Sequence, residues 1–192
     1  MFDRICKERY FSEEKAANIF KQMISAVKYM HLNGICHRDL KPDNFLFENN
    51  QEGSIIKLID FGLSSSFIDR ETSKQIKMNT QCGTSYYMAP ELIMGDYDER
   101  CDIWSLGVIL YIMLCGMPPF YSADNEEEVY GMIIKGNVTF EDEVWQDISD
   151  EGKDLLLKIL TSADMRLSLE QALNHPWFTK SHKPEGMNKI NT

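Results

Sequence analysis

Residues 37–47 read HRDLKPDNFLF, a charged, turn-forming half followed by a short apolar half. The apolar residues 45–47 and a second apolar run at residues 55–59 flank a segment rich in Asn, Glu and Gly. Two short β-type runs separated by turn residues predict a small β-hairpin. Asp60 follows the second run directly, and Asn44 lies only five positions after Asp39. Asp39, Asn44 and Asp60 are therefore polar candidates that stand beside the two predicted strands.

Helical periodicity dominates the chain on both sides of the hairpin. Ser12 is expected to cap an amphipathic helix that ends at residues 33–34. Further helices are expected at about residues 101–115, 125–135, 149–160 and 168–174, and residues 64–81 are expected to form a long polar loop. The sequence thus predicts a mainly α (α+β) fold with one domain over residues 1–178. A polar tail at residues 179–192 is expected to follow it.

Composition narrows the classes of partner. The chain has 30 acidic and 20 basic residues and a formal net charge of −10. Such a charge repels nucleic acid and anionic lipid, so neither is expected as a partner. The negative charge favours a basic peptide as a partner, although a role in keeping the protein soluble would explain the same charge. The longest apolar stretch, residues 103–117, is shorter than the ~20 residues that span a bilayer. We expect a cytoplasmic protein, with the nucleus as an alternative.

The five cysteines are widely spaced, without a C-x-x-C pair. This spacing predicts neither a zinc site nor a disulfide framework, and we expect free thiols, most of them buried.

Three ordered motifs identify a family. Residues 37–44 match the signature H-R-D-L-x-x-x-N, and Asp60-Phe61-Gly62 and Ala89-Pro90-Glu91 follow at the expected separations. The chain resembles the eukaryotic protein kinase family, and in particular the C-terminal lobe of a serine/threonine kinase. Residues 145, 148–149, 153–155 and 175–178 resemble the calcium/calmodulin-dependent group, most closely the calcium-dependent protein kinases. This likeness implies a protein substrate and a calcium-sensing regulatory domain or calmodulin as a partner.

The resemblance assigns catalytic roles and implies ATP and Mg²⁺ as cofactors. Taken alone, a loop aspartate such as Asp39 is usually a helix cap or a solvated charge, and Asp60 would be a turn residue. Within the motifs, Asp39 is expected to orient the incoming hydroxyl and accept its proton, and Lys41 to lie near the transferred phosphate. The remaining residues implied at the site are Asn44 and Asp60 as Mg²⁺ ligands, Thr84 as a hydrogen-bond partner of Asp39 and Lys41, and Leu46 beneath the adenine.

Regulatory and structural roles follow from the same resemblance. Arg38 is expected to bind a phosphate on the activation segment, and Thr80, four residues before Thr84, is the best match for its position. The structural residues implied are His37 and Phe61, which pack together beside Gly62; Asp102, which holds the backbone of the catalytic loop; and the buried ion pair of Glu91 and Arg166.

Motifs of the family's N-terminal β-lobe do not occur in this sequence. It contains no G-x-G-x-x-G run, strand lysine of the V-A-I-K kind or partner glutamate. We expect that lobe to be a missing partner in the full-length protein, and the isolated chain to be catalytically incompetent. The alternative is a non-catalytic, one-lobed scaffold or interaction module that uses the peptide groove or the acidic residues 126–128.

Overall fold

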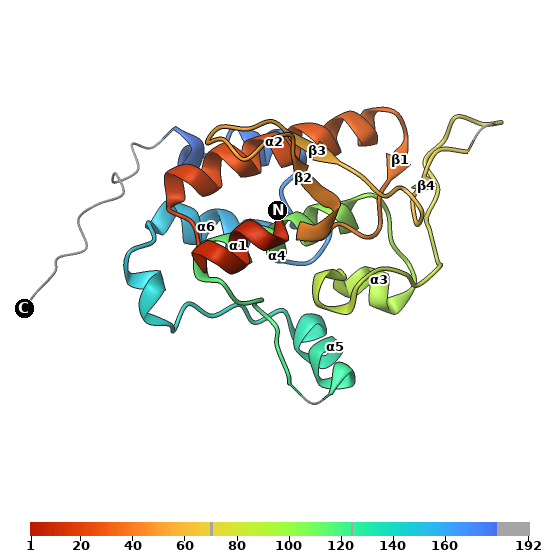
Figure 1. Cartoon of the computed structure of the whole chain (residues 1–192). Helices are drawn as coiled ribbons and strands as arrows, with labels where there is room; N and C mark the ends of the chain where they lie inside the picture. The colour runs from red at the N-terminus through yellow and green to blue at the C-terminus, as the bar shows by residue number, and fades with distance from the viewer. Residues whose placement is uncertain (70, 124, 180–192) are drawn as a thin grey trace, which may run out of the picture.

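Two long helices form the centre of the molecule. The computed structural model describes residues 1–69, 71–123 and 125–179, and within them α2 (Glu13–Leu32) packs against α4 (Arg100–Cys115) (Figure 1). The Ser12 hydroxyl accepts a hydrogen bond from the Lys15 amide and so caps α2 as predicted. Almost every residue of α4 is buried, because its apolar side chains surround the whole helix. Gly116 ends α4 with φ 85°.

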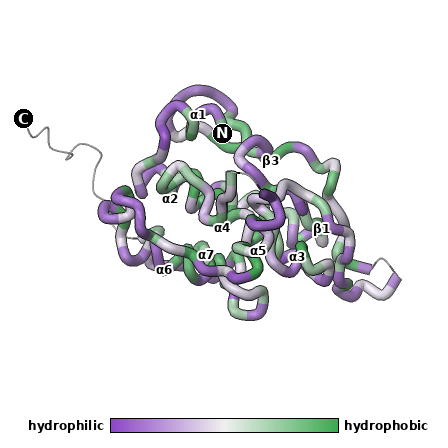
Figure 2. The backbone as a smooth tube through the Cα atoms, turned by 90° about the horizontal axis from the view of Figure 1, so that it is seen from below, coloured by the Kyte–Doolittle hydropathy of each residue, from purple (hydrophilic) through white to green (hydrophobic). Residues whose placement is uncertain are grey.

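Shorter elements surround this pair. The remaining helices are α1 (Phe2–Glu8), α3 (Pro90–Met94), α5 (Glu126–Lys135), α6 (Asp150–Ile159) and α7 (Leu169–Leu173). Single 3₁₀ turns occur at η1 (Pro42–Asn44), η2 (Ser85–Tyr87), η3 (Glu143–Gln146) and η4 (Pro176–Phe178). The predicted helices are thus confirmed to within one or two residues at each end. Hydrophilic segments, drawn in purple, lie mainly along the outer loops (Figure 2).

Two small antiparallel sheets complete the fold. Strand β2 (Phe45–Phe47) pairs with β3 (Ile56–Leu58), Phe45 opposite Leu58, which confirms the predicted hairpin. Strand β1 (Ile35–Cys36) pairs with β4 (Ser65–Ser66). The prediction of an unbroken loop over residues 64–81 is therefore wrong at its start, because a two-residue strand leaves no periodicity in the sequence. The architecture is mainly α with small antiparallel sheets, as predicted.

The ends and the surface bear on two further predictions. Residues 180–192, most of the predicted polar tail, lie outside the described residues. Among the described residues, no helix combines the length and the apolar character that crossing a bilayer requires. Beyond β4 the chain projects from the body as an extended turn before it returns to α3 (Figure 1).

Candidate active site

A buried carboxylate at the start of α4 holds the loop of residues 37–44 from below. Asp102 Oδ2 accepts a hydrogen bond from the His37 amide at 2.8 Å, and Oδ1 accepts one from the Arg38 amide at 2.9 Å. His31 Nε2, near the end of α2, lies 2.9 Å from Asp102 Oδ2. Arg38 adopts φ 69°, a left-handed conformation that is rare for a residue with a side chain. The structure thus contains the contacts expected of Asp102 and adds His31, which the sequence analysis did not single out.

The charge on Asp102 is stabilised by these donors. Its burial alone would raise the pKa of the carboxyl, since desolvation disfavours the charged form. The hydrogen bonds from His31 and from the amides of His37 and Arg38 outweigh that cost and hold the pKa of Asp102 below its ordinary value. The loop is therefore fastened to a carboxylate that stays ionised inside the protein.

Asp39, Lys41 and Thr84 form a closed triangle on the outer side of this loop. Lys41 Nζ donates to Asp39 Oδ2 at 2.7 Å and to Thr84 Oγ1 at 3.1 Å, and Thr84 Oγ1 donates to Asp39 Oδ1 at 2.8 Å. Gly83 permits this approach, because a Cβ on it would lie 2.6 Å from the Arg38 carbonyl oxygen. The backbone of Gly83 also has φ 110°, which side chains disfavour. A segment 45 residues away is thus fixed against the loop.

Hydrogen bonds to backbone groups connect Asn44 to Asp39, and the residue before Asp60 to Asn44. Asn44 Nδ2 donates to the Asp39 carbonyl oxygen at 2.8 Å, and the Asn44 carbonyl oxygen accepts from the Ile59 amide at 2.9 Å. Asp60 is the next residue, with φ 61° and its Oδ1 3.2 Å from the Gly62 amide. Among the described residues Asp60 forms no ion pair, and its carboxylate is exposed. The hairpin therefore brings the carboxylate of Asp60 and the amide of Asn44, both suitable oxygen donors for Mg²⁺, to one edge.

The outer edge of the hairpin is apolar and open. Phe61 lies 5.5 Å from His37 between ring centroids, which is the contact expected of this pair. His37 Nε2 also lies 3.1 Å from the Ile59 carbonyl oxygen, and the His37 ring is fully buried. By contrast, Phe61 is 51% exposed and Leu46 is 45% exposed. A buried histidine held in this way is a structural contact for Phe61.

Arg38 reaches the activation segment through a residue that the sequence analysis missed. Its Nη1 donates to the Tyr97 hydroxyl at 3.2 Å, and that hydroxyl donates to the Thr80 carbonyl oxygen at 2.7 Å. Tyr97 and Met78 also exchange two backbone hydrogen bonds. Burial raises the pKa of Tyr97 to about 12, so its hydroxyl keeps the proton that it donates. Thr80 itself is exposed, and its carbonyl oxygen is linked to Arg38 through the Tyr97 hydroxyl.

The ion pair expected between Glu91 and Arg166 is present in a buried, bidentate form. Arg166 Nη1 and Nη2 lie 2.5 and 3.1 Å from the two carboxylate oxygens of Glu91. Arg166 also donates to the Arg100 carbonyl oxygen at 2.7 Å. Because Arg166 follows α6 and Glu91 lies in α3, this pair fastens the segment after Thr84 to the helical base.

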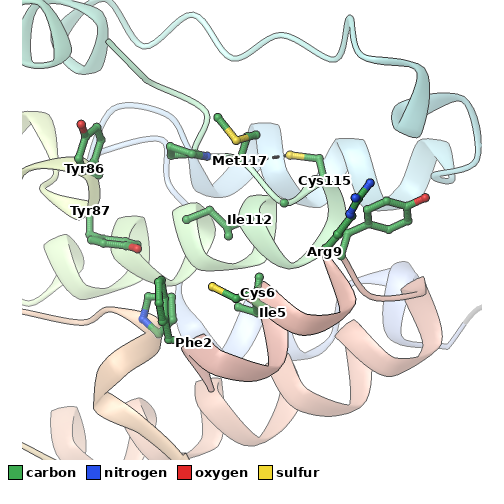
Figure 3. Close-up of a pocket in the computed structure, with 13 residues that line it drawn as sticks. Phe2, Ile5, Cys6, Arg9, Tyr86, Tyr87, Ile112, Cys115 and Met117 are labelled. Carbon is green, nitrogen blue, oxygen red and sulfur yellow. Dashed lines mark hydrogen bonds between the residues drawn. The ribbon is translucent and has the colours of Figure 1, made fainter. Parts of the chain in front are cut away.

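An apolar cavity of about 510 Å³ borders the triangle (Figure 3). Phe2, Ile5 and Cys6 of α1 form one wall, and Ile112 of α4 lies across from them. The end of the cavity nearest the site is lined by Pro42, next to Lys41, and by the two tyrosines of η2. The other end is lined by the C-terminal end of α4 and residues 116–118. One end of the cavity is therefore lined by residues close in sequence to Lys41 and Thr84.

Comparison with known proteins places these features in a family. A family model described as the protein kinase domain matches residues 1–178. The chain is 46% identical over 181 residues to calcium-dependent protein kinase 3 of Plasmodium yoelii yoelii, covering 94% of this chain and 33% of the relative. It is 47% identical to calcium-dependent protein kinase 4 of Plasmodium falciparum (isolate 3D7), with 98% and 35% covered. Identity to calcium-dependent protein kinase 3 of Oryza sativa subsp. japonica is 44%, with 95% and 32% covered. The chain spans about a third of the length of these relatives.

Proposed function

The chain belongs to the protein kinase family, and from that premise we propose that it carries the phosphoacceptor side of a serine/threonine protein kinase. In the complete protein this site would transfer the γ-phosphate of ATP to a Ser or Thr hydroxyl of a protein substrate. The closed triangle of Asp39, Lys41 and Thr84 is the observation that carries the proposal. Phosphoryl transfer asks for positioning and charge stabilisation more than for covalent chemistry, and this triangle offers both.

Each member of the triangle has a distinct task. Asp39 would orient the acceptor hydroxyl and take its proton, and its carboxylate is held by two donors. Lys41 would place a positive charge beside the transferred phosphate. Thr84 would keep Asp39 in position, because the Thr84 hydroxyl bonds to both Asp39 and Lys41. These bonds would also hold the segment around Thr84, against which the substrate would lie, close to the loop.

ATP and Mg²⁺ are general cofactors of the family, and the donors of this site fit them. Asn44 and Asp60 would hold Mg²⁺, because carboxylate and amide oxygens are its preferred protein ligands and Asp60 has no competing cation among the described residues. When bound, Mg²⁺ neutralises negative charge on the phosphate oxygens. Leu46 would contact the adenine with its exposed side chain, and Phe61 would present its open face to the N-terminal lobe of a complete kinase domain.

The substrate and the control of the site are finer proposals. A net charge of −10 and the exposed Asp43, two residues after Lys41, favour a substrate that is basic around its Ser or Thr. The cavity beside Tyr86 would take an apolar side chain of the same peptide.

The names of the relatives support calcium control through a regulatory domain or calmodulin. Phosphorylation of Thr80, with the phosphate bound by Arg38, would add a second level of control. Five free thiols fit a cytoplasmic location, with the nucleus as the alternative.

A phosphate-transfer assay tests the proposal. We would measure transfer of labelled phosphate from Mg-ATP to a basic serine peptide by two proteins: the 192-residue chain and the product of the same reading frame with any upstream codons. We expect negligible turnover by the chain, because no residue of it supplies the glycine-rich loop or the strand lysine. In the longer protein, Asp39→Asn should lower turnover by at least about 100-fold.

The controls separate this function from the scaffold alternative. Asp43→Asn is the matched change of an exposed carboxylate in the same loop, and it should raise KM for the basic peptide more than it lowers kcat. Equal turnover by the longer protein and its Asp39→Asn variant would contradict the proposed role of the triangle. A stop codon directly upstream of Met1, together with an inactive chain, would favour a one-lobed interaction module.

A further inference from the structure

Four metal-binding side chains meet beneath the catalytic loop, away from Asn44 and Asp60. The ligand atoms of His31, Cys36 and Asp102 all lie within 4.8 Å of one another. A second thiol joins them, because Cys101 Sγ is 3.6 Å from Cys36 Sγ. These residues come from the end of α2, from β1 and from the start of α4. One imidazole, one thiol and one carboxylate thus lie close enough to share an ion, and a second thiol lies beside the first.

We propose that this cluster is a binding site for a divalent ion of the Zn²⁺ class, with His31, Cys36, Cys101 and Asp102 as its ligands. Zn²⁺ takes four ligands in a tetrahedron, with Zn–S distances of about 2.3 Å, which separates two sulfur ligands by about 3.8 Å. The observed separation of 3.6 Å between the two thiols is close to that edge. The ligand atoms of His31, Cys36 and Asp102 already lie within 4.8 Å of one another, and Cys101 would turn its thiol toward them to supply the fourth ligand.

The composition and surroundings of the cluster favour a thiophilic ion over Mg²⁺ or Ca²⁺. Sulfur and imidazole donors suit Zn²⁺, whereas Mg²⁺ and Ca²⁺ prefer oxygen ligands and several waters. Cys36 and Cys101 are buried and therefore shielded from bulk water. The ring of Phe67 packs edge-on against His31 at 5.9 Å between centroids and covers one side of the site. Of these ligands, His31 retains an exposed edge, 11% of its side chain, which gives an ion a way in.

The spacing of the ligands explains why the sequence predicted no zinc site. Cys36 and Cys101 are 65 residues apart and belong to no C-x-x-C pair. The prediction that most cysteines are buried is also wrong, since Cys6 is exposed and Cys82 and Cys115 are partly exposed. Of the five thiols only the two of this cluster are buried, and their contact joins β1 to the start of α4.

Ion binding here would act on the catalytic loop through a shared ligand. Asp102 Oδ2 already accepts from the His37 amide, and Oδ1 accepts from the Arg38 amide. An ion on Oδ2 would replace the His31 hydrogen bond with two metal bonds and tie α2, β1 and α4 to one centre. The site is therefore placed to stabilise the fold and to adjust the loop that holds Asp39. This inference does not depend on the proposed kinase activity.

A Co²⁺ titration of the full chain in the presence of a phosphine reductant tests the site. Co²⁺ occupies Zn²⁺ sites and reports its ligands optically. We expect one ion per chain, a thiolate-to-cobalt charge-transfer band and the intense visible bands of a tetrahedral site, all abolished by one equivalent of Zn²⁺. Zn²⁺ should also raise Tm, because an ion that binds only the folded state stabilises it. A reduced, folded chain that gives no charge-transfer band would overturn the proposal.

Matched cysteine variants locate the ion. Cys36→Ala and Cys101→Ala should each weaken Co²⁺ binding by at least about tenfold and reduce the charge-transfer band, since one thiolate is lost. Cys115→Ala and Cys6→Ala, whose side chains line the cavity of Figure 3, should leave both unchanged. Circular dichroism identifies any variant that fails to fold, and the wild-type titration then decides alone. A band that persists in the Cys36→Ala/Cys101→Ala double variant would show that the ion binds elsewhere.

Discussion

The two sides of the loop at residues 37–44 are built in opposite ways. Its underside rests on Asp102, which is fully buried and accepts hydrogen bonds from His37, Arg38 and His31. Its outer edge ends in the apolar side chains of Leu46 and Phe61, both about half exposed. At these three positions a charged side chain is buried and two apolar side chains are half exposed, the reverse of the usual distribution.

The underside of the loop already has all its hydrogen-bond partners, whereas the apolar side chains at the outer edge remain uncovered. On the underside every carboxylate oxygen of Asp102 has a donor, so the loop is held whether or not a ligand is present. The outer edge gains nothing from its exposed apolar area until another surface covers it. The underside should therefore determine stability, and the outer edge should matter for contacts outside the described residues.

The largest expected effect is on the underside. Asp102→Ala removes the acceptor for two backbone amides and for His31, and leaves the amides buried without partners. Each unsatisfied buried donor costs about 1–3 kcal/mol, so the free energy of unfolding should fall by about 3–5 kcal/mol. Urea unfolding followed by circular dichroism measures this change.

Asp96→Ala provides the control for Asp102→Ala. Asp96 is exposed, and the change should alter the free energy of unfolding by no more than about 0.5 kcal/mol. A loss below about 1 kcal/mol in Asp102→Ala would mean that the underside does not hold the loop, and the contrast between the two sides would not stand.

Local sequence signals were sufficient for most of the fold. The cap at Ser12 and the two apolar runs of the hairpin each act over a few residues, and both were located from the sequence. Strands β1 and β4 were missed because two residues carry no period and their pairing depends on distant chain. Their positions are set by tertiary packing.

The candidate site shows the same division between local and distant signals. Asp39, Asn44 and Asp60 stand in motifs with fixed spacing, so they were found from sequence. Tyr97 and His31 were missed, because a single tyrosine or histidine outside a motif is indistinguishable from a core residue. Their function as hydrogen-bond partners exists only once Arg38 and Asp102 lie beside them.

An intermediate effect on the free energy of unfolding is expected at Asp98, whose carboxylate is less buried than that of Asp102 but less exposed than the side chain of Leu46. Asp98 lies near the activation segment, with its carboxylate 2.8 Å from Arg100 Nη2 and 3.3 Å from Lys77 Nζ. Burial would raise its pKa, but the hydrogen bonds and charge of Arg100 outweigh burial and lower the pKa to about 2. A carboxyl whose folded pKa is depressed stabilises the protein above its unfolded pKa, and this stability is lost as the pH falls toward the folded value.

Asp98→Asn should therefore lower the free energy of unfolding in a pH-dependent manner. At neutral pH we expect a loss of about 1–2 kcal/mol, a discounted figure because solvent screens Arg100 and Lys77. The difference from wild type should shrink as the pH falls from about 6 to about 3, since the wild-type carboxyl progressively loses its advantage. Urea unfolding at several pH values measures it. A difference that is constant with pH would show that the effect is one of packing.

The smallest expected effect is on the outer edge. Leu46→Ala removes a side chain that is already 45% exposed, so little apolar surface is returned to water on unfolding. The free energy of unfolding should fall by no more than about 1 kcal/mol, clearly less than for Asp102→Ala. Phe45→Ala is the matched change on the same strand, but its ring points to the opposite face and is fully buried, so about 3–5 kcal/mol should be lost. Equal losses at the two positions would mean that Leu46 is covered in solution, and the outer edge would then be closed by a contact within the chain itself.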